Sequence, residues 1–240
     1  MKISLIIGCF LLLSACGPIR PNPTGWTEKT IETKYLSFQI WEKDIQAGQP
    51  IRIYIEGDGD PMPDKPIALT FAEKDTAQNV IYLSRPCQYV WCQECKNPAL
   101  WQEERFNEEI VDEMARVIRH FERKYQTADI DLIGYDGGGT MALLVSSKVP
   151  VKRVITIGGI LDTQKYSEVH RIKLNGMKPS DVENILEHIP QIHYVGENDK
   201  DAPRQQAEHF VHKFKKPKSI AVKIVPDATH TNWEHLIIEQ

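Results

Sequence analysis

The sequence predicts an α/β fold in which a mostly parallel central sheet is covered by helices on both faces. Strand-like segments recur along the chain with helix-like segments between them, which is the order expected of a parallel sheet. The longest helix-like segment carries a continuous apolar stripe, so it is expected to pack against that sheet. The chain has 240 residues and no internal repeat, which suits one such domain once its N-terminal segment is set aside.

The candidate strands are short and rich in isoleucine and valine. In chain order they cover residues 51–55, 80–83, 130–133, 151–157, 192–195 and 221–225. The main helix is expected between the second and third of them, where apolar side chains recur at helical spacing. Its stripe consists of Phe106, Ile110, Met114, Val117 and Phe121, broadened by Val111 and Ile118. A second helix is predicted to begin at Gly137, and a third to cover residues 203–214.

Residues 1–15 are expected to be a signal peptide rather than part of the domain. Lys2 precedes an apolar run of about eleven residues, too short for a bilayer span of roughly 20. The letters LSAC, ending at Cys16, resemble the lipobox of bacterial lipoproteins. That resemblance implies cleavage before Cys16, a diacylglyceryl thioether on its sulfur and an acyl chain such as palmitate on its amino group. Gly17 implies an outer-membrane location facing the periplasm. The alternative is an ordinary secretory signal with a chance cysteine.

Residues 16–27 are rich in proline and glycine, so they are expected to form the lipidated N-terminus and a tether, followed by a single domain over 28–240. The net charge is −4, and the one basic cluster, KFKKPK at 213–218, is expected to be a solvated helix end. Nucleic acid is therefore not an expected partner, whereas the membrane is, through the lipid on Cys16. The stretches GDGD and GGG lack the context of a nucleotide-binding motif, so no cofactor is expected.

The most informative stretch is IGYDGGG at residues 133–139, between a predicted strand and a predicted helix. In the Gly-x-Ser-x-Gly nucleophile elbow, a sharp strand-to-helix turn lifts one side chain above the sheet, and small neighbours allow close packing. Asp136 stands at the position of the nucleophile. The elbow therefore indicates the fold, whereas the usual serine nucleophile is replaced, so the reaction of a serine enzyme does not follow from this pattern.

This order of elements, with GYDGGG at the elbow, resembles the α/β-hydrolase superfamily over nearly all of the chain after the tether. In that superfamily a turn after an early strand supplies one backbone N–H of the oxyanion hole, and the residue after the nucleophile supplies the other. Glu56-Gly57-Asp58-Gly59 matches that turn, so the resemblance implies Asp58 and Gly137 as donors. Glu56 departs from the histidine that is common there. A turn serving only chain reversal is the alternative.

The resemblance further implies an acid after the fifth predicted strand and a histidine after the last. GENDKDAP follows that fifth strand and indicates Asp199 as the acid, with Asp201 as its competitor. Either residue could instead cap the next helix. His230 is the predicted base. His235, expected on a following helix, is expected to be an exposed or packing residue, and His170 lies in the predicted lid segment.

A carboxylate at position 136 is already ionised at neutral pH, because the ordinary pKa of an aspartate side chain is about 3.9. Its attack on an ester carbonyl would give a high-energy anhydride, so an Asp nucleophile suits an sp³ carbon that carries a leaving group. Water activated by His230, itself oriented by Asp199, would then cleave the alkyl ester. Haloalkane dehalogenases and epoxide hydrolases of this fold work in this way. They usually carry a large leaving-group stabiliser where this chain has Gly137.

Two classes of function follow from these residues. The first is a hydrolase with a triad-like Asp136, Asp199 and His230, acting on a small or medium substrate, because the short and charged lid segment (161–187) does not suit long lipids. The alternative is a catalytically disabled serine-hydrolase-like protein with a binding or envelope scaffold role. In it, Asp136 would fill the oxyanion hole and raise the pKa of His230. The presence of both Asp199 and His230 favours the hydrolase.

The letters RPCQY at residues 85–89, with Cys92 and Trp101, resemble a group of exported bacterial α/β-hydrolase-like proteins whose elbow reads GYSGG. Cys87, Cys92 and Cys95 lie within nine residues. In an exported protein these cysteines predict a disulfide from Cys87 to Cys92 or to Cys95, with one thiol left over. A metal site is the alternative, but no histidine lies nearby in the sequence to complete a zinc shell, so no metal is expected.

Overall fold

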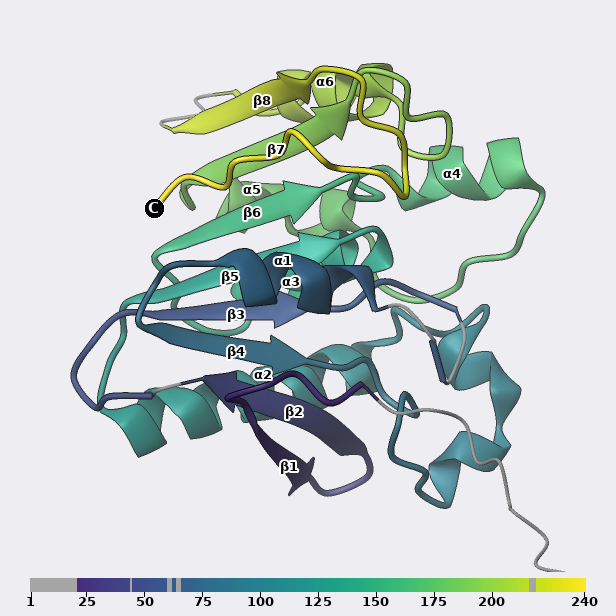
Figure 1. Cartoon of the computed structure of the whole chain (residues 1–240). Helices are drawn as coiled ribbons and strands as arrows, with labels where there is room; N and C mark the ends of the chain where they lie inside the picture. The colour runs from purple at the N-terminus through teal and green to yellow at the C-terminus, as the bar shows by residue number, and fades with distance from the viewer. Residues whose placement is uncertain (1–20, 44, 60–61, 64–65, 216–218) are drawn as a thin grey trace, which may run out of the picture.

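The computed structural model describes residues 21–43, 45–59, 62–63, 66–215 and 219–240. The predicted signal peptide, Cys16 and the first part of the predicted tether lie outside these residues. The described strands form a sheet of eight. They are β1 (Thr27–Glu32), β2 (Ser37–Lys43), β3 (Ile51–Ile55), β4 (Asn79–Leu83), β5 (Ile130–Tyr135), β6 (Arg153–Ile157), β7 (Gln191–Gly196) and β8 (Ile220–Val225). Figure 1 shows them side by side with their carboxyl ends toward the same edge, apart from the hairpin of β1 and β2.

The helices lie mainly between the parallel strands. The α-helices are α1 (Ile67–Lys74), α2 (Glu108–Tyr125), α3 (Gly137–Ser146), α4 (Thr163–His170), α5 (Glu183–Leu186) and α6 (Arg204–His212). Short 3₁₀ helices are η1 (Glu94–Lys96), η2 (Pro98–Trp101) and η3 (Pro179–Val182). In the described part of the chain, no helix is both long and apolar enough to cross a membrane.

The strand order is β1-β2-β4-β3-β5-β6-β7-β8. From β4 to β8 neighbouring strands run parallel, whereas β2 pairs antiparallel with both β1 and β4. The predicted α/β class with a mostly parallel sheet is therefore confirmed. The β1–β2 hairpin extends the sheet at one edge and was not expected from the sequence. All five residues of β3 are buried, as befits a strand covered on both faces.

The two faces of the sheet carry separate apolar clusters. On one face, Ile53 and its neighbours on the same side of β3 pack with residues of α2, α3 and α6. On the other, Tyr54 packs with α1 and with Trp233 from the C-terminal segment. Figure 1 shows α1 and this C-terminal segment in front of the sheet, with α2 and α3 behind it. Helices therefore cover both faces, although the segment after β8 covers part of one face without forming a helix.

The predicted apolar stripe is confirmed: it lies on α2, apart from Phe106, which precedes the helix. All seven predicted stripe residues, from Phe106 to Phe121, are at most 1% exposed. The helix begins after Asn107, whose side-chain oxygen accepts the N–H of Ile110 at 2.8 Å and caps the free N-terminal turn. It ends at Tyr125, and the next residue, Gln126, adopts a left-handed conformation. This stripe belongs to the same apolar cluster as residues of β3 and β5, so its burial stabilises the centre of the sheet, from which the candidate site projects.

Candidate active site

Asp136 stands on a sharp turn between β5 and α3, as the elbow pattern predicts. Its φ of 51° and ψ of −125° lie outside the regions that L-residues ordinarily occupy. Gly134 permits the turn, because a Cβ there would lie 2.1 Å from the carbonyl oxygen of Gly138. The Asp136 N–H donates to the Ile157 carbonyl at 3.1 Å and fixes the turn to β6. The strained backbone is thus held by its neighbours and directs the carboxylate above the sheet.

His230 lies between two carboxylates. Its Nδ1 is 3.0 Å from Oδ2 of Asp199, and its Nε2 is 3.4 Å from Oδ1 of Asp136. The Asp199 side chain is fully buried, and its other oxygen accepts the N–H groups of Asp201 and Ala202, each at 2.9 Å. Asp199, not the exposed Asp201, is therefore the acid that faces the imidazole. Asp199 orients His230 so that Nε2 points at the elbow.

The two predicted oxyanion donors both point at the Asp136 side chain. The Asp58 N–H lies 3.3 Å from Oδ2 of Asp136, and the Gly137 N–H also donates to this carboxylate. One oxygen of Asp136 therefore faces the Asp58 N–H, while the other faces His230. Gly137 leaves no room for a side chain, since a Cβ there would lie 1.9 Å from the Asp58 carboxylate.

Electrostatics couple Asp136 to His230. Burial alone would lower the pKa of His230, but the hydrogen bonds and charges of Asp136 and Asp199 outweigh it and raise that pKa to about 10. Burial likewise opposes ionisation of Asp136. The hydrogen bond and charge of His230, with the N–H groups of Gly137 and Asp58, nevertheless hold the pKa of Asp136 below its ordinary value. At neutral pH the pair is an imidazolium and a carboxylate.

Two arginines hold the turn that carries the Asp58 donor. Nη1 of Arg85 lies 2.5 Å from one oxygen of the Asp58 carboxylate, and Nε of Arg105 lies 2.6 Å from the other. Arg85 also donates to the carbonyl of Arg105 at 2.7 Å. The Gln88 side chain donates to the Gly57 carbonyl at 3.2 Å. The role of Arg85 and Arg105 in the site was not predicted from the sequence. The signal that could have indicated it is Asp58 itself, because a buried carboxylate at the oxyanion turn needs a basic partner.

Glu56 supports the same turn from below. It is buried, and its Oε1 accepts the N–H of Gly57 at 3.0 Å and that of Ala68, near the start of α1, at 3.4 Å. Burial raises the pKa of Glu56 to about 7, against the opposing effect of these N–H bonds. Glu56, which stands where a histidine is common, therefore joins the oxyanion turn to the N-terminus of α1.

The remaining predicted histidines lie outside this arrangement. His170 stacks on Tyr166 at the end of α4, with ring centroids 4.1 Å apart. His235 is exposed, as expected, but it lies in a turn rather than on the expected helix, because the chain after β8 runs back across the sheet. The segment that carries α4 lies beyond the carboxyl ends of the strands, which is the position of the predicted lid (Figure 1).

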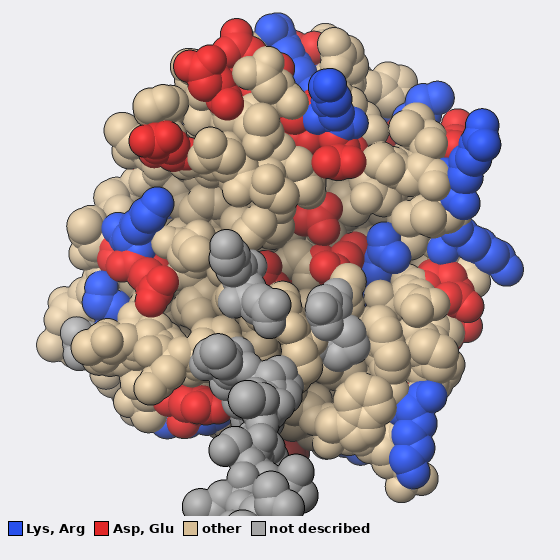
Figure 2. Space-filling view, turned by 45° about the vertical axis from the view of Figure 1, so that its right-hand side comes forward, with Lys and Arg blue, Asp and Glu red and all other residues tan. Residues whose placement is uncertain are grey.

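A cavity of about 750 Å³ opens beside the Asp58 turn. It is lined by Gly59, Trp101, Gln102, Glu103, Arg105, Ile172 and Lys173. Arg105 belongs to both this cavity and the Asp58 ion pair, so the cavity adjoins the candidate site. Figure 2 views the molecule from the side where the carboxyl ends of the parallel strands lie. Acidic side chains surround a hollow near the middle of this view, with basic side chains beside it. The lining therefore combines the apolar side chains of Trp101 and Ile172 with charged side chains such as Arg105.

Two groups of potential metal ligands occur among the described residues. In the first, Cys87 and Cys95 form a disulfide, so only Cys92 remains a free thiol. In the second, Asp199 and His230 direct their ligand atoms at each other. Neither of these two groups is arranged as an open metal centre.

The strand-to-helix elbow, the parallel sheet and the order in which Asp136, Asp199 and His230 follow β5, β7 and β8 define an α/β hydrolase. The sequence pattern of the dienelactone hydrolase family matches residues 93–235, more than half of the sequence. The chain belongs to the dienelactone hydrolase family.

Solved structures show the same fold at low sequence identity. Est1E from Butyrivibrio proteoclasticus superposes with a TM-score of 0.63 at 13% identity, over 87% of this chain and 91% of that one. XC6422 from Xanthomonas campestris, described as an α/β serine hydrolase without a lid, gives 0.58 at 11%, over 88% of each chain. A putative dienelactone hydrolase from Klebsiella pneumoniae gives 0.60 at 14%, over 85% and 86%. No curated protein matches the sequence.

Proposed function

We propose that this hydrolase uses Asp136 as a nucleophile, His230 as the base for a water molecule, Asp199 to orient His230, and the N–H groups of Asp58 and Gly137 as an oxyanion hole. The observation that carries the proposal is the two-sided contact of the Asp136 carboxylate. Its Oδ2 accepts the Asp58 N–H, its Oδ1 faces Nε2 of His230, and the Gly137 N–H also donates to this carboxylate. A carboxylate held in this way has one oxygen ready to form a bond and another where negative charge can be stabilised.

In the first step, a carboxylate oxygen of Asp136 attacks an sp³ carbon of the substrate. A carbon–oxygen bond forms as the bond to the leaving group breaks, and the leaving group departs with the electron pair. The product is an alkyl ester of Asp136. The lowered pKa of Asp136 keeps the nucleophile ionised, so this step needs no base.

In the second step, water cleaves the ester. His230 takes a proton from a water molecule, and the resulting hydroxide attacks the Cγ of Asp136. The N–H groups of Asp58 and Gly137 stabilise the oxyanion that develops on the ester oxygen. Collapse releases the alcohol, which takes the proton from His230, and leaves Asp136 as a carboxylic acid. That acid then gives its proton to the neutral His230, which restores the carboxylate and the imidazolium of the resting protein.

Ester formation itself makes His230 a base. In the resting protein its pKa of about 10 keeps it protonated at neutral pH, mainly through the two carboxylates that overcome burial. Once Asp136 is an ester its negative charge is gone, so the pKa of His230 must fall. The histidine is therefore inactive before the first step and becomes active for the second. A serine at position 136 would lack this coupling.

We propose a small or medium polar substrate. The cavity beside Asp58 carries the charged side chains of Glu103, Arg105 and Lys173, which suits polar rather than long-chain molecules. The close contact of Gly137 with Asp58 excludes a large leaving-group stabiliser at position 137, so a typical haloalkane dehalogenase site is not supported.

We further propose that Cys16 carries lipid and anchors the domain in the outer membrane, facing the periplasm. The support is the LSAC sequence, the apolar run before it and the proline-rich tether after it. Radiolabelled palmitate should enter the native protein but not Cys16→Ser, and equal labelling of both would contradict the anchor.

The test of the mechanism is a single turnover in ¹⁸O water. Panels of alkyl halides, epoxides and esters are offered to the protein, and the peptide that contains Asp136 is weighed. Because water attacks Cγ, one ¹⁸O atom should enter the Asp136 carboxylate. In His230→Ala the second step is blocked, so the same peptide should gain the mass of the alkyl group. His235→Ala, at an exposed histidine, is the matched control and should turn over normally.

Two results would contradict an Asp nucleophile. The first is turnover without label in Asp136. The second is no turnover by the native protein together with activity in Asp136→Ser. That second result would identify the alternative, a disabled serine-hydrolase-like protein in which the carboxylate only fills the oxyanion hole.

A further inference from the structure

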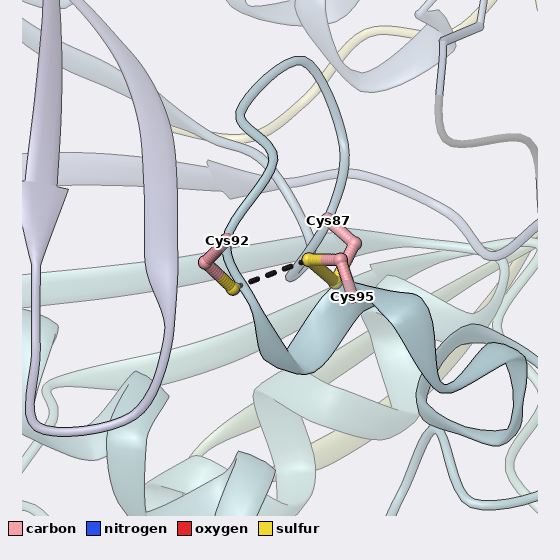
Figure 3. A group of neighbouring side chains, drawn as sticks. All are labelled: Cys87, Cys92 and Cys95. Atoms are coloured by element: carbon pink, nitrogen blue, oxygen red, sulfur yellow. Dashed lines mark hydrogen bonds between the residues drawn. A yellow bond between two sulfur atoms is a disulfide. The ribbon is translucent and has the colours of Figure 1, made fainter.

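Three sulfur atoms lie together on the loop between β4 and α2. Cys87 and Cys95 form a disulfide, and the Sγ of Cys92 lies 3.2 Å from the Sγ of Cys95 without being bonded to it. Figure 3 shows the Cys92 sulfur directed toward this disulfide from the neighbouring turn of the loop. The contact is closer than about 3.5 Å, the separation at which non-bonded heavy atoms usually settle. The third sulfur therefore already lies within reach of the bond.

The three cysteines differ in access to solvent. Cys87 is 2% exposed and Cys95 is fully buried, so a reagent in solution cannot reach their disulfide directly. Cys92 is partly exposed and is the free thiol of the group. Cys92 and Cys95 are also separated by only two residues, Gln93 and Glu94, which is the spacing of redox-active cysteine pairs. Cys92 thus connects the buried disulfide to the solvent.

We propose that Cys92, Cys95 and Cys87 form a thiol–disulfide exchange site in which Cys92 is the attacking thiol. Cys92 gives its proton to solvent, and the thiolate attacks the Sγ of Cys95. The Cys92–Cys95 bond forms as the Cys87–Cys95 bond breaks, and Cys87 leaves as a thiolate that takes a proton from solvent. The number of disulfides is unchanged, so the step needs no external oxidant or reductant. Small thiols and disulfides in solution would enter through Cys92.

The exchange acts on the loop that holds the oxyanion turn. Cys87 lies between Arg85, which binds the Asp58 carboxylate, and Gln88, which binds the Gly57 carbonyl. Cys87 has a φ of 65°, in the left-handed region that side chains disfavour. The bond to Cys95 helps to hold this conformation. Release of Cys87 would allow the backbone there to relax and would loosen both contacts with the turn.

The exchange is tested by mapping the free thiol. The full-length protein is held without added thiol at about pH 8, where cysteine begins to ionise, and samples are quenched in acid. They are unfolded and alkylated while still acidic. Cleavage after Trp91 and after Glu94 then places the three cysteines on separate peptides. We expect alkylated Cys87 as well as alkylated Cys92, with the minor form above about 1%.

The control is Cys92→Ser, which lacks the attacking thiol and leaves the Cys87–Cys95 bond in place. In this variant Cys87 should never be alkylated. Reduction of the disulfide by an external monothiol should also be slower than in the native protein, by about tenfold or more. The reason is that the buried Cys87–Cys95 bond can no longer exchange with the exposed thiol of Cys92. Alkylation of Cys92 alone in the native protein, together with equal reduction rates in both proteins, would overturn the proposal.

A second readout reports on the loop without requiring turnover. In Cys87→Ser the two cysteines left in this loop can pair only with each other, so hydrogen exchange at the Gly57 and Asp58 amides should be faster than in Cys92→Ser. If Cys87→Ser does not fold, the thiol map and the reduction rate still decide the proposal. The exchange does not depend on Asp136 being a nucleophile, so either idea can fail alone.

Discussion

At the scale of single residues, one carboxylate at position 136 determines the protonation of the site. A serine hydroxyl is neutral and needs a neutral histidine to activate it, whereas Asp136 is charged and keeps His230 protonated. The chain therefore has the elbow, acid and histidine of an α/β hydrolase, but the charge state of its histidine is the opposite of the one that a serine nucleophile needs. This reversal has a measurable effect on stability.

We expect Asp136→Asn to lower the pKa of His230 and to reduce the fall in stability at alkaline pH. A histidine with a raised pKa contributes stability below its unfolded pKa of about 6.5, and this contribution is lost as the pH rises through about 10. The native protein should therefore lose about 1–3 kcal/mol more of its free energy of unfolding than the variant between neutral and alkaline pH. Denaturant unfolding across this range, with imidazole NMR titration, measures both effects.

Asp201→Asn is the matched control, because Asp201 is a nearby but exposed carboxylate whose side chain accepts no hydrogen bond from His230. It should leave the pKa of His230 and the alkaline slope close to native. Equal slopes in the native protein and Asp136→Asn would show that the Asp136 charge does not reach the imidazole.

At the scale of elements, the pattern of apolar residues predicted the buried helix and the central strands, but not the exposed strand at the edge of the sheet. The stripe from Phe106 to Phe121 and the central strands followed from burial, which leaves a clear period in the sequence. Strand β1 is almost wholly exposed, so its sequence carries no such period, and its pairing with β2 was missed. Helix α1 was also missed, because its eight residues are too few for a clear helical pattern.

The candidate site, too, could be predicted only in part from the sequence. Asp136, Asp199 and His230 could be predicted because each follows a strand, and parallel strands end at the same edge. The pairing of Cys87 with Cys95 could not be chosen over Cys92, because both fit the spacing. Arg85 and Arg105 meet at Asp58 only through the path of the irregular loop between them, which no periodicity describes.

The start of α2 gives a test at this scale. Asn107→Ala removes the side-chain acceptor for the Ile110 N–H and should cost about 1 kcal/mol of the free energy of unfolding. Asn97→Ala is the control, since Asn97 makes the same kind of bond to Ala99 at the short and exposed helix η2. Its cost should be smaller, because few packing contacts depend on η2. Denaturant titration of both variants measures the difference, and equal costs would contradict the anchoring role of α2.

At the scale of the whole molecule, Arg52 joins the sheet to the C-terminal segment. This buried side chain projects from β3 and lies 2.9 Å from Asp75 at the end of α1. It also donates to the carbonyl of Glu239 at 3.0 Å, while Asp131 on β5 lies 3.9 Å away. One arginine therefore holds together two buried acids and the last segment of the chain.

Arg52→Met should destabilise the protein by about 3–5 kcal/mol, because it leaves the buried Asp75 carboxylate without its cationic partner. Equilibrium unfolding gives the cost, and proteolysis should detect loosening of residues 234–240. Arg153→Met is the comparison, since Arg153 binds Asp131 from a more exposed position and should cost less. A loss of less than about 1 kcal/mol in Arg52→Met would show that the C-terminal segment is held by its apolar contacts alone.

The site is assembled from loops after β3, β5, β7 and β8, which are distant in the sequence. Asp58 and Asp136 are 78 residues apart, and Asp199 and His230 are 31 apart. Contacts of such long range form slowly, because a large loop must close before any of them contributes energy. Helix α2 and its stripe are local and can form early, whereas the elbow, the oxyanion turn and His230 meet only when the sheet is complete through β8. During refolding, the pairing of His230 with Asp136 should therefore be among the last events.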